Sequence, residues 1–170
     1  ARLAQNPNPA TGEDSEQIRR FIARNADSRL AHVLRREWLA RLGKTASWDV
    51  FNEQYVRHAG EEQDIACYSW QERLERKDAE VLNEARGLWL SGRSAPEACD
   101  IPLRAVLAGG KLDAEQQWAR LRRLLDQGAA NDVRRMLQWP ETTIRINETR
   151  LAAANADPGR FLAKEKLEPR

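Results

Sequence analysis

The sequence predicts an all-α protein built from antiparallel helical hairpins. Apolar residues recur at helical spacing along most of the 170 residues, whereas runs that alternate with period two are few and β-branched residues are sparse. Short connections make consecutive helices antiparallel neighbours. Such hairpins stack into an α-superhelix, tetratricopeptide-like but irregular, or pack into a globular helical bundle. The weak recurrence of tryptophan along the chain favours the α-superhelix.

Residues 1–13 begin with prolines and asparagines and are expected to form a linker or a frayed N-terminus. Residues 14–170 are expected to form the helical domain, or part of one. The expected helices span residues 14–25, 28–42, 46–58, 62–76, 78–91, 100–109, 113–127, 129–138 and 141–155, with a weaker helix at 158–166.

Residue types at the segment ends supply these boundaries. Two segment starts fit a capping box, Asp14 with Gln17 and Asp113 with Gln116. Glycine can adopt the left-handed conformation that closes a last helical turn, and five glycines each follow an apolar segment. These are Gly43, Gly60, Gly92, Gly109 and Gly128.

Each expected helix carries an apolar stripe that should face the core. The clearest stripes contain Leu30, Leu34, Trp38 and Leu42, then Trp48, Phe51 and Tyr55, and then Trp118, Leu121 and Leu125. No stretch approaches the roughly 20 apolar residues that cross a membrane, so no membrane span is expected.

The charge balance argues against nucleic acid as a partner. The chain has 28 basic and 26 acidic side chains, a net charge of +2, whereas nucleic-acid-binding domains usually show a strong basic excess. Arginine pairs at 19–20, 35–36, 122–123 and 134–135 could form a polyanion or glycan surface. Polar helix faces paired with nearby acidic residues explain these arginines better.

No motif for a cofactor, a metal or a nucleophile is present: the chain has no Gly-rich phosphate loop, HExxH, CxxC or G-x-S-x-G. His32 and His58 lie on different expected helices and lack further ligands. Three carboxylate pairs lie in polar surroundings that would not raise the pKa of a general acid. These are Glu13 with Asp14, Glu61 with Glu62, and Glu72 with Glu75. We therefore assign no catalytic residue, no metal ligand and no cofactor.

Cys67 and Cys99 are the two cysteines of the chain. From the residues alone, four roles are open: a metal clip, a nucleophile with a spare thiol, two buried thiols, or a disulfide. A metal clip lacks further ligands, and a nucleophile lacks an obvious base.

Three stretches resemble the N-terminal helical domain of the soluble lytic murein transglycosylases of Gram-negative bacteria. They are SRLAHVLRREWLARLGKTASWDVFNEQY (28–55), ACYSWQERLERKDAEVLNEARGLWLSGRSAPEACDIPLRAVLAGGKL (66–112) and WARLRRLLDQGAANDVRRML (118–137). The most specific piece is Cys67, followed by a helical hairpin with LWLSG and then ACD at Cys99. The resemblance covers about residues 15–155, in order.

The resemblance implies a periplasmic enzyme that cleaves peptidoglycan between N-acetylmuramic acid and N-acetylglucosamine and leaves a 1,6-anhydro-muramoyl end. In that family a C-terminal lysozyme-like domain carries the chemistry, and one Glu in a Glu-Ser motif acts as acid and then base. No glutamate of this chain is followed by serine. We therefore carry over no catalytic residue and expect the catalytic domain to lie outside this chain.

The family's helical domain is a curved superhelix against which the catalytic domain packs. The partners implied are the glycan strands of peptidoglycan and the parent's own catalytic domain, with the segment acting as a scaffold and guide. A free-standing helical-repeat adaptor and an enzyme that uses a carboxylate pair are the alternatives. Because the family's domain is longer than this chain, exposed apolar residues are expected on the last helix, at Leu151, Phe161 and Leu162.

The cysteines fit this scheme as a disulfide. Cys67 falls on one helix and Cys99 at the start of the next but one, and such helices are adjacent in a stack of hairpins. The turn Ser94-Ala95-Pro96 would bring Cys99 back to Cys67. An oxidising periplasm would keep the bond, whereas a cytosolic protein would carry two free thiols.

Overall fold

The computed structural model describes residues 12–58 and 60–164, and all regular structure within these ranges is helical. The predicted all-α class is confirmed. Most of the expected linker, residues 1–11, lies outside the described residues. The helices are α1 (Glu13–Arg24), α2 (Arg29–Lys44), α3 (Trp48–Tyr55), α4 (Gln63–Glu75), α5 (Glu80–Ser91), the 3₁₀ turn η2 (Glu97–Cys99), α6 (Asp100–Ala108), α7 (Ala114–Asp126), α8 (Ala130–Leu137), α9 (Glu148–Ala156) and α10 (Pro158–Lys164). None of these helices is long and apolar enough to cross a membrane.

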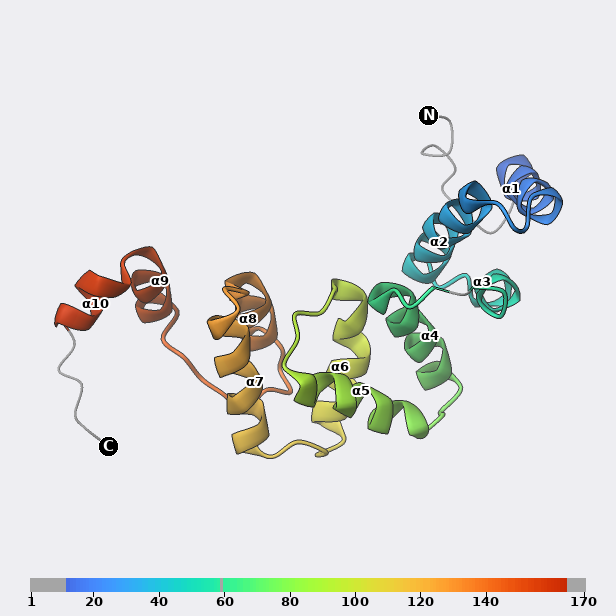
Figure 1. The fold of residues 1–170 in the computed structure, drawn as a ribbon. Coiled ribbons are helices and arrows are strands. Elements are labelled where there is room, and N and C mark those ends of the chain that lie inside the picture. The colour runs from blue at the N-terminus through green and yellow to red at the C-terminus, as the bar shows by residue number, and fades with distance from the viewer. Residues whose placement is uncertain (1–11, 59, 165–170) are drawn as a thin grey trace.

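The helices follow one another in chain order across an elongated molecule (Figure 1). α1 to α4 lie at one end, α5 and α6 in the middle, α7 and α8 beyond them, and α9 with α10 at the other end. Packing is mainly local: α2 contacts α3 and α4, α5 contacts α6, and α7 contacts α8. Each helix is thus stabilised largely by its neighbours along the chain.

Two apolar clusters form the interior. The smaller one lies among α1 to α4 and contains Ile22, Trp38, Leu39, Leu42, Phe51 and Ile65. The larger one runs from α4 to the segment after α8, and its members include Cys67, Trp89, Cys99, Leu103, Leu121, Leu124, Met136 and Ile144. Tyr68 of α4 packs against both clusters, so α4 joins the two halves of the core.

α2 and α4 approach so closely that no side chain fits between them at Gly43. The sequence places Gly43 beyond the end of a helix, but α2 continues to Lys44 and Gly43 is buried inside its last turn. A Cβ at this position would lie 2.2 Å from the Cγ of Tyr68. The expectation of a helix-ending glycine is wrong here, because the glycine serves helix packing instead.

Gly43→Ala is expected to destabilise the protein, because the added methyl group must displace Tyr68. Overpacking typically costs about 1–3 kcal/mol, partly offset by up to ~1 kcal/mol from the better helix propensity of alanine. Urea denaturation measures the difference. The matched control is Gly87→Ala in α5, where a Cβ meets nothing within 4 Å and stability should rise slightly. Equal or greater stability of Gly43→Ala than wild type would contradict the close contact.

The helix expected at 141–155 begins only at Glu148, and residues 141–147 form an irregular segment. Pro140 precedes this segment, and its β-branched residues disfavour a helix. Thr142 and Ile144 are buried while Thr143 between them is exposed. The Oε1 of Gln117 in α7 accepts a hydrogen bond from the Thr143 backbone N–H at 3.1 Å. The prediction was therefore wrong over 141–147, where tertiary contacts support non-helical backbone.

One of the two expected capping boxes forms. Asp113 accepts a hydrogen bond from the backbone N–H of Gln116 at 2.8 Å, and the Gln116 side chain accepts from the Asp113 N–H at 3.2 Å. The expected box at Asp14 and Gln17 is wrong, because the N-cap of α1 is Gly12, two residues before Asp14. The Gln17 amide instead donates to the Glu13 carboxylate at 3.3 Å.

The apolar stripes face the core only in part. Trp38 and Leu121 are buried as expected, but Leu30, Trp118 and Leu125 remain 62%, 37% and 36% exposed. The buried face of α7 includes two polar residues, Gln117 and Arg120, whose side chains donate to the backbone carbonyls of Leu112 and Trp89. The buried residues of α7 are Gln117, Arg120, Leu121 and Leu124.

The C-terminal hairpin of α9 and α10 is the least buried part of the described chain, and α10 has no buried residue. Leu162 is 54% exposed, as expected. Phe161 is half-buried, with the Arg150 guanidinium 5.8 Å from its ring centroid. Leu151 is half-buried and packs against the larger core cluster. The expectation of exposed apolar residues holds for Leu162 and is wrong for the other two.

Candidate functional site

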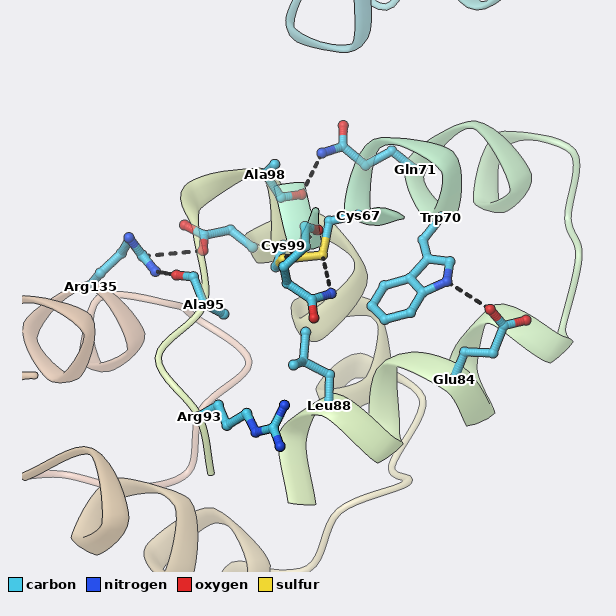
Figure 2. Close-up of a disulfide and its surroundings, with 12 residues drawn as sticks. Cys67, Trp70, Gln71, Glu84, Leu88, Arg93, Ala95, Ala98, Cys99 and Arg135 are labelled. Atoms are coloured by element: carbon cyan, nitrogen blue, oxygen red, sulfur yellow. Dashed lines mark hydrogen bonds and ion pairs between the residues drawn. A yellow bond between two sulfur atoms is a disulfide. The ribbon is translucent and has the colours of Figure 1, made fainter. Parts of the chain in front are cut away.

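The two cysteines meet where α4 and the segment before α6 converge (Figure 2). Cys67 lies in the second turn of α4, and Cys99 ends η2. Their sulfur atoms are 2.02 Å apart, their Cα atoms are 4.9 Å apart, and both residues are fully buried. The structure therefore brings the two site residues selected from the sequence into one disulfide, with neither thiol left for a metal or a substrate.

Side chains of α4 hold the crosslinked segment on either side of the bond. The Gln71 amide donates to the Ala98 carbonyl at 2.6 Å, and the Gln63 amide lies 3.6 Å from the Cys67 sulfur. One turn away, the Trp70 indole N–H donates to Glu84 at 2.7 Å (Figure 2). The Gln71 bond thus holds η2 against α4, and the Trp70 bond joins α4 to α5.

The chain reversal before Cys99 starts earlier than the sequence suggests. α5 ends at Ser91 and is followed by Gly92, whose φ of 67° is left-handed. Residues 93–96 then form an irregular connection that leads into η2. The turn expected at Ser94-Ala95-Pro96 is therefore wrong, because glycine makes the reversal at lower steric cost.

Side chains of α7 bond to the carbonyl groups at the end of α5. Arg120 donates to the carbonyls of Trp89 and Arg93, each at 3.1 Å, and to that of Leu88 at 3.3 Å. Nearby, Arg123 donates to the Leu90 carbonyl and Gln127 donates to the Gly92 carbonyl. The last carbonyls of a helix lack intrahelical partners and favour cations, so this set caps α5 from a neighbouring helix.

Arg120 is the most deeply buried charge of this set. Its guanidinium lies 5.1 Å from the centroid of the Trp89 ring, which adds a cation–π contact. Burial lowers the pKa of Arg120 to about 10, with Arg135 acting in the same direction and Asp132 and Asp100 opposing it. Arg120 remains charged at neutral pH. This role could not be predicted from the sequence, because Arg120 occupies what looks like one more polar position on an amphipathic helix.

The paired arginines are engaged within the molecule, which supports the polar-face interpretation. At least one member of each pair contacts another element of the fold. The contacts with carboxylates are Arg19 with Glu53 at 2.8 Å, Arg36 with Asp64 at 3.4 Å, Arg122 with Glu115 at 2.6 Å and Arg135 with Asp100 at 3.1 Å. Arg35 and Arg123 instead donate to backbone carbonyls, those of Arg57 and Leu90.

The two histidines line one open cleft, together with Arg36 and Glu62. His58 follows the end of α3, and its Nε2 lies 2.9 Å from the Glu62 carboxylate. Burial opposes ionisation of Glu62, but hydrogen bonds from its backbone and from His58 lower the pKa of Glu62 below its ordinary value. Among the described residues no group of three or more side chains could hold a metal ion. His32 and His58 thus line the same cleft, but the described residues around them do not form a metal site.

Of the carboxylate pairs, Glu72 departs from the expected solvated position. It is only 5% exposed, accepts a hydrogen bond from Asn52 at 2.9 Å and pairs with Arg76. Its partner in sequence, Glu75, is exposed. Glu72 thus links α4 to α3, a contact that helical spacing alone does not reveal.

The reactive and charged groups around the disulfide are already bonded to other groups of the protein. The thiols are joined, and Arg120 is bonded to backbone carbonyls. Such an arrangement suits a structural or binding role better than catalysis, which needs a nucleophile or acid that can reach a substrate. No protein-family model matches the chain, and no curated protein sequence matches it either.

Proposed function

We propose that this chain is a non-catalytic segment of the α-superhelical domain of a periplasmic lytic murein transglycosylase. In this role it scaffolds the enzyme and guides glycan strands of peptidoglycan toward a catalytic domain elsewhere in the parent protein. The observation that carries the proposal is the link between Cys67 and Cys99. These residues bracket the most specific part of the sequence resemblance, and they lie in one disulfide.

The order of the helices also supports the proposal. Helices that pack mainly on their sequence neighbours are typical of stacked-hairpin domains, which present long surfaces to extended ligands. The elongated, sequential arrangement in Figure 1 fits such a domain better than a compact bundle. A glycan strand is an extended polymer, so a long helical surface suits it.

A buried disulfide is consistent with the proposed location. Disulfides persist in oxidising compartments such as the periplasm and are rare in the cytosol of mesophiles. Cys67 and Cys99 are fully buried. Redox-active cysteines are usually accessible to solvent, so this burial is typical of a stabilising crosslink.

The chain alone is expected to release no 1,6-anhydro-muropeptides from purified peptidoglycan sacculi above background, and to co-sediment with the sacculi. Chromatography of the soluble products with mass detection measures release, and quantification of the pellet measures binding. An active lytic transglycosylase is the positive control for release. Anhydro product formed by this chain would overturn the non-catalytic assignment, and absence of co-sedimentation would count against glycan guidance.

A further inference from the structure

One of the six tryptophans makes no contact that explains its place in the fold. Three are buried in the core clusters, namely Trp38, Trp89 and Trp139. Trp48 meets Phe51 edge-on at 5.8 Å between ring centroids, and the Trp70 indole donates to Glu84 at 2.7 Å. Trp118 is 37% exposed, and among the described residues its indole has no aromatic partner, cation–π contact or hydrogen bond.

Trp118 belongs to a solvent-facing stripe along α7. Residues three and four positions apart share a face of a helix, and the stripe follows this spacing. It consists of four exposed residues, Glu115, Trp118, Arg122 and Leu125. Arg120, which bonds to the end of α5, points to another side of the helix. The stripe is about 15 Å long, since each helical residue adds roughly 1.5 Å.

The stripe places polar groups beside the apolar ones. Nη2 of Arg122 lies 2.6 Å from the Glu115 carboxylate, so this ion pair spans the two helical turns from which Trp118 projects. Both side chains are more than half exposed, and an exposed ion pair contributes little to stability. Its donors and acceptors can therefore turn toward a ligand at little cost. Because the two charges cancel, the stripe suits an uncharged polar ligand better than a polyanion.

The apolar area of the stripe is too small for a stable protein interface. Since a tryptophan can bury up to ~250 Å², an exposure of 37% leaves about 90 Å² of Trp118 in contact with solvent. Leu125, which is 36% exposed, adds less than this. A stable protein–protein interface buries about 800 Å² on each partner, of which roughly half is apolar. The stripe therefore fits a narrow ligand of small rings better than a second protein.

The sugar rings of a β-1,4-linked strand have the matching chemistry. Each pyranose ring has a face of C–H groups and a rim of hydroxyl and acetamido groups. The negative face of an indole attracts C–H groups, a guanidinium donates to carbonyl and hydroxyl oxygens, and a carboxylate accepts from hydroxyl and amide groups.

We propose that the α7 stripe binds β-1,4-linked N-acetylhexosamine strands, with Trp118 stacked on one sugar ring and Arg122 and Glu115 bonded to the substituents of that ring or its neighbour. This inference rests on the proposed function. It assigns the contact with the glycan strand to one helix, and it gives the exposed tryptophan a role that the packing of the fold does not.

Nuclear magnetic resonance titration with chitohexaose, a β-1,4-linked N-acetylglucosamine oligomer, tests this contact at a single side chain. The indole N–H groups of the six tryptophans are separate reporters in the ¹⁵N-labelled chain. The Trp118 signal, identified by its absence in Trp118→Ala, is expected to shift until the site saturates. The signals of Trp38 and Trp89 in the core should stay fixed. Saturable binding that leaves the Trp118 signal unmoved would overturn the site.

The variants give the corresponding affinities from the shifts of backbone amides. Trp118→Ala is expected to weaken chitohexaose binding roughly five-fold or more, the scale of losing one stacking contact. The matched control Ile101→Ala removes another exposed apolar side chain, on α6, and should bind as wild type. Equal affinity of Trp118→Ala and wild type would overturn the site.

Arg122→Met tests the same surface without changing the indole. Because Arg122 is exposed, this variant should melt as wild type does but bind chitohexaose more weakly. It decides the matter if Trp118→Ala fails to fold, and unchanged affinity would then overturn the site.

Co-sedimentation with peptidoglycan sacculi separates this inference from the proposed function. If wild type and Trp118→Ala sediment equally with the sacculi, glycan guidance stands and the α7 site is overturned. If wild type binds neither sacculi nor chitohexaose, both are overturned. Self-association of the wild-type chain that is lost in Trp118→Ala, measured by analytical ultracentrifugation, would assign the stripe to a second copy of the chain and overturn the sugar site.

Discussion

Replacing Cys67 and Cys99 together with alanine is expected to lower the free energy of unfolding by about 3–4 kcal/mol, because the crosslink restricts the unfolded chain. The bond joins residues separated by 32 positions, a long loop in the chain-entropy account. Helical content should persist, since each helix is packed mainly on its neighbours. Urea denaturation followed by circular dichroism gives both quantities.

Reductant provides the matched control for this double variant. The wild-type protein should melt at a lower temperature when the disulfide is reduced in the denatured state, whereas the alanine variant should be insensitive to reductant. An unchanged wild-type melt under reductant, or a double variant as stable as wild type, would show that the bond contributes little to the fold.

Arg120→Met is expected to lower stability by an amount on the order of 3 kcal/mol, although methionine keeps much of the buried volume. Its guanidinium bonds to three carbonyl groups at the end of α5, and a buried group left without a partner costs about 1–3 kcal/mol. Relief of the buried charge offsets part of that loss. Urea denaturation at neutral pH measures the net effect.

Arg122→Met on the same helix is the control. Arg122 is exposed and pairs with Glu115 at 2.6 Å, and exposed ion pairs contribute about 0–1 kcal/mol. A loss of stability in Arg120→Met no greater than in Arg122→Met would mean that the carbonyl contacts of Arg120 do not support the α5–α7 packing.

The features that could be predicted from the sequence are those set by local chemistry. Helical periodicity identified most of the helical segments. The capping box at Asp113 and Gln116 followed from residue type and spacing alone. The residues alone left four roles open for Cys67 and Cys99, and the family resemblance favoured the disulfide that the structure contains.

The features that escaped prediction depend on contacts between elements. Gly43 looks like a helix terminator until Tyr68 of the distant α4 is placed against it. Residues 141–147 continue the helical pattern weakly, but Gln117 from α7 bonds to Thr143 and supports irregular backbone. In α7, the need to cap α5 turns Arg120 inward and leaves Trp118 at the surface. No rule of spacing within one helix contains this information.

The coding sequence downstream of this segment in its genome tests the proposed function most directly. If this segment belongs to a lytic murein transglycosylase, the same reading frame must encode further helical hairpins and then a lysozyme-like domain with a Glu-Ser motif. We expect sequencing of that region to find this domain. A stop codon directly after the helical segment, or a downstream domain of an unrelated kind, would contradict the assignment and favour a free-standing helical adaptor.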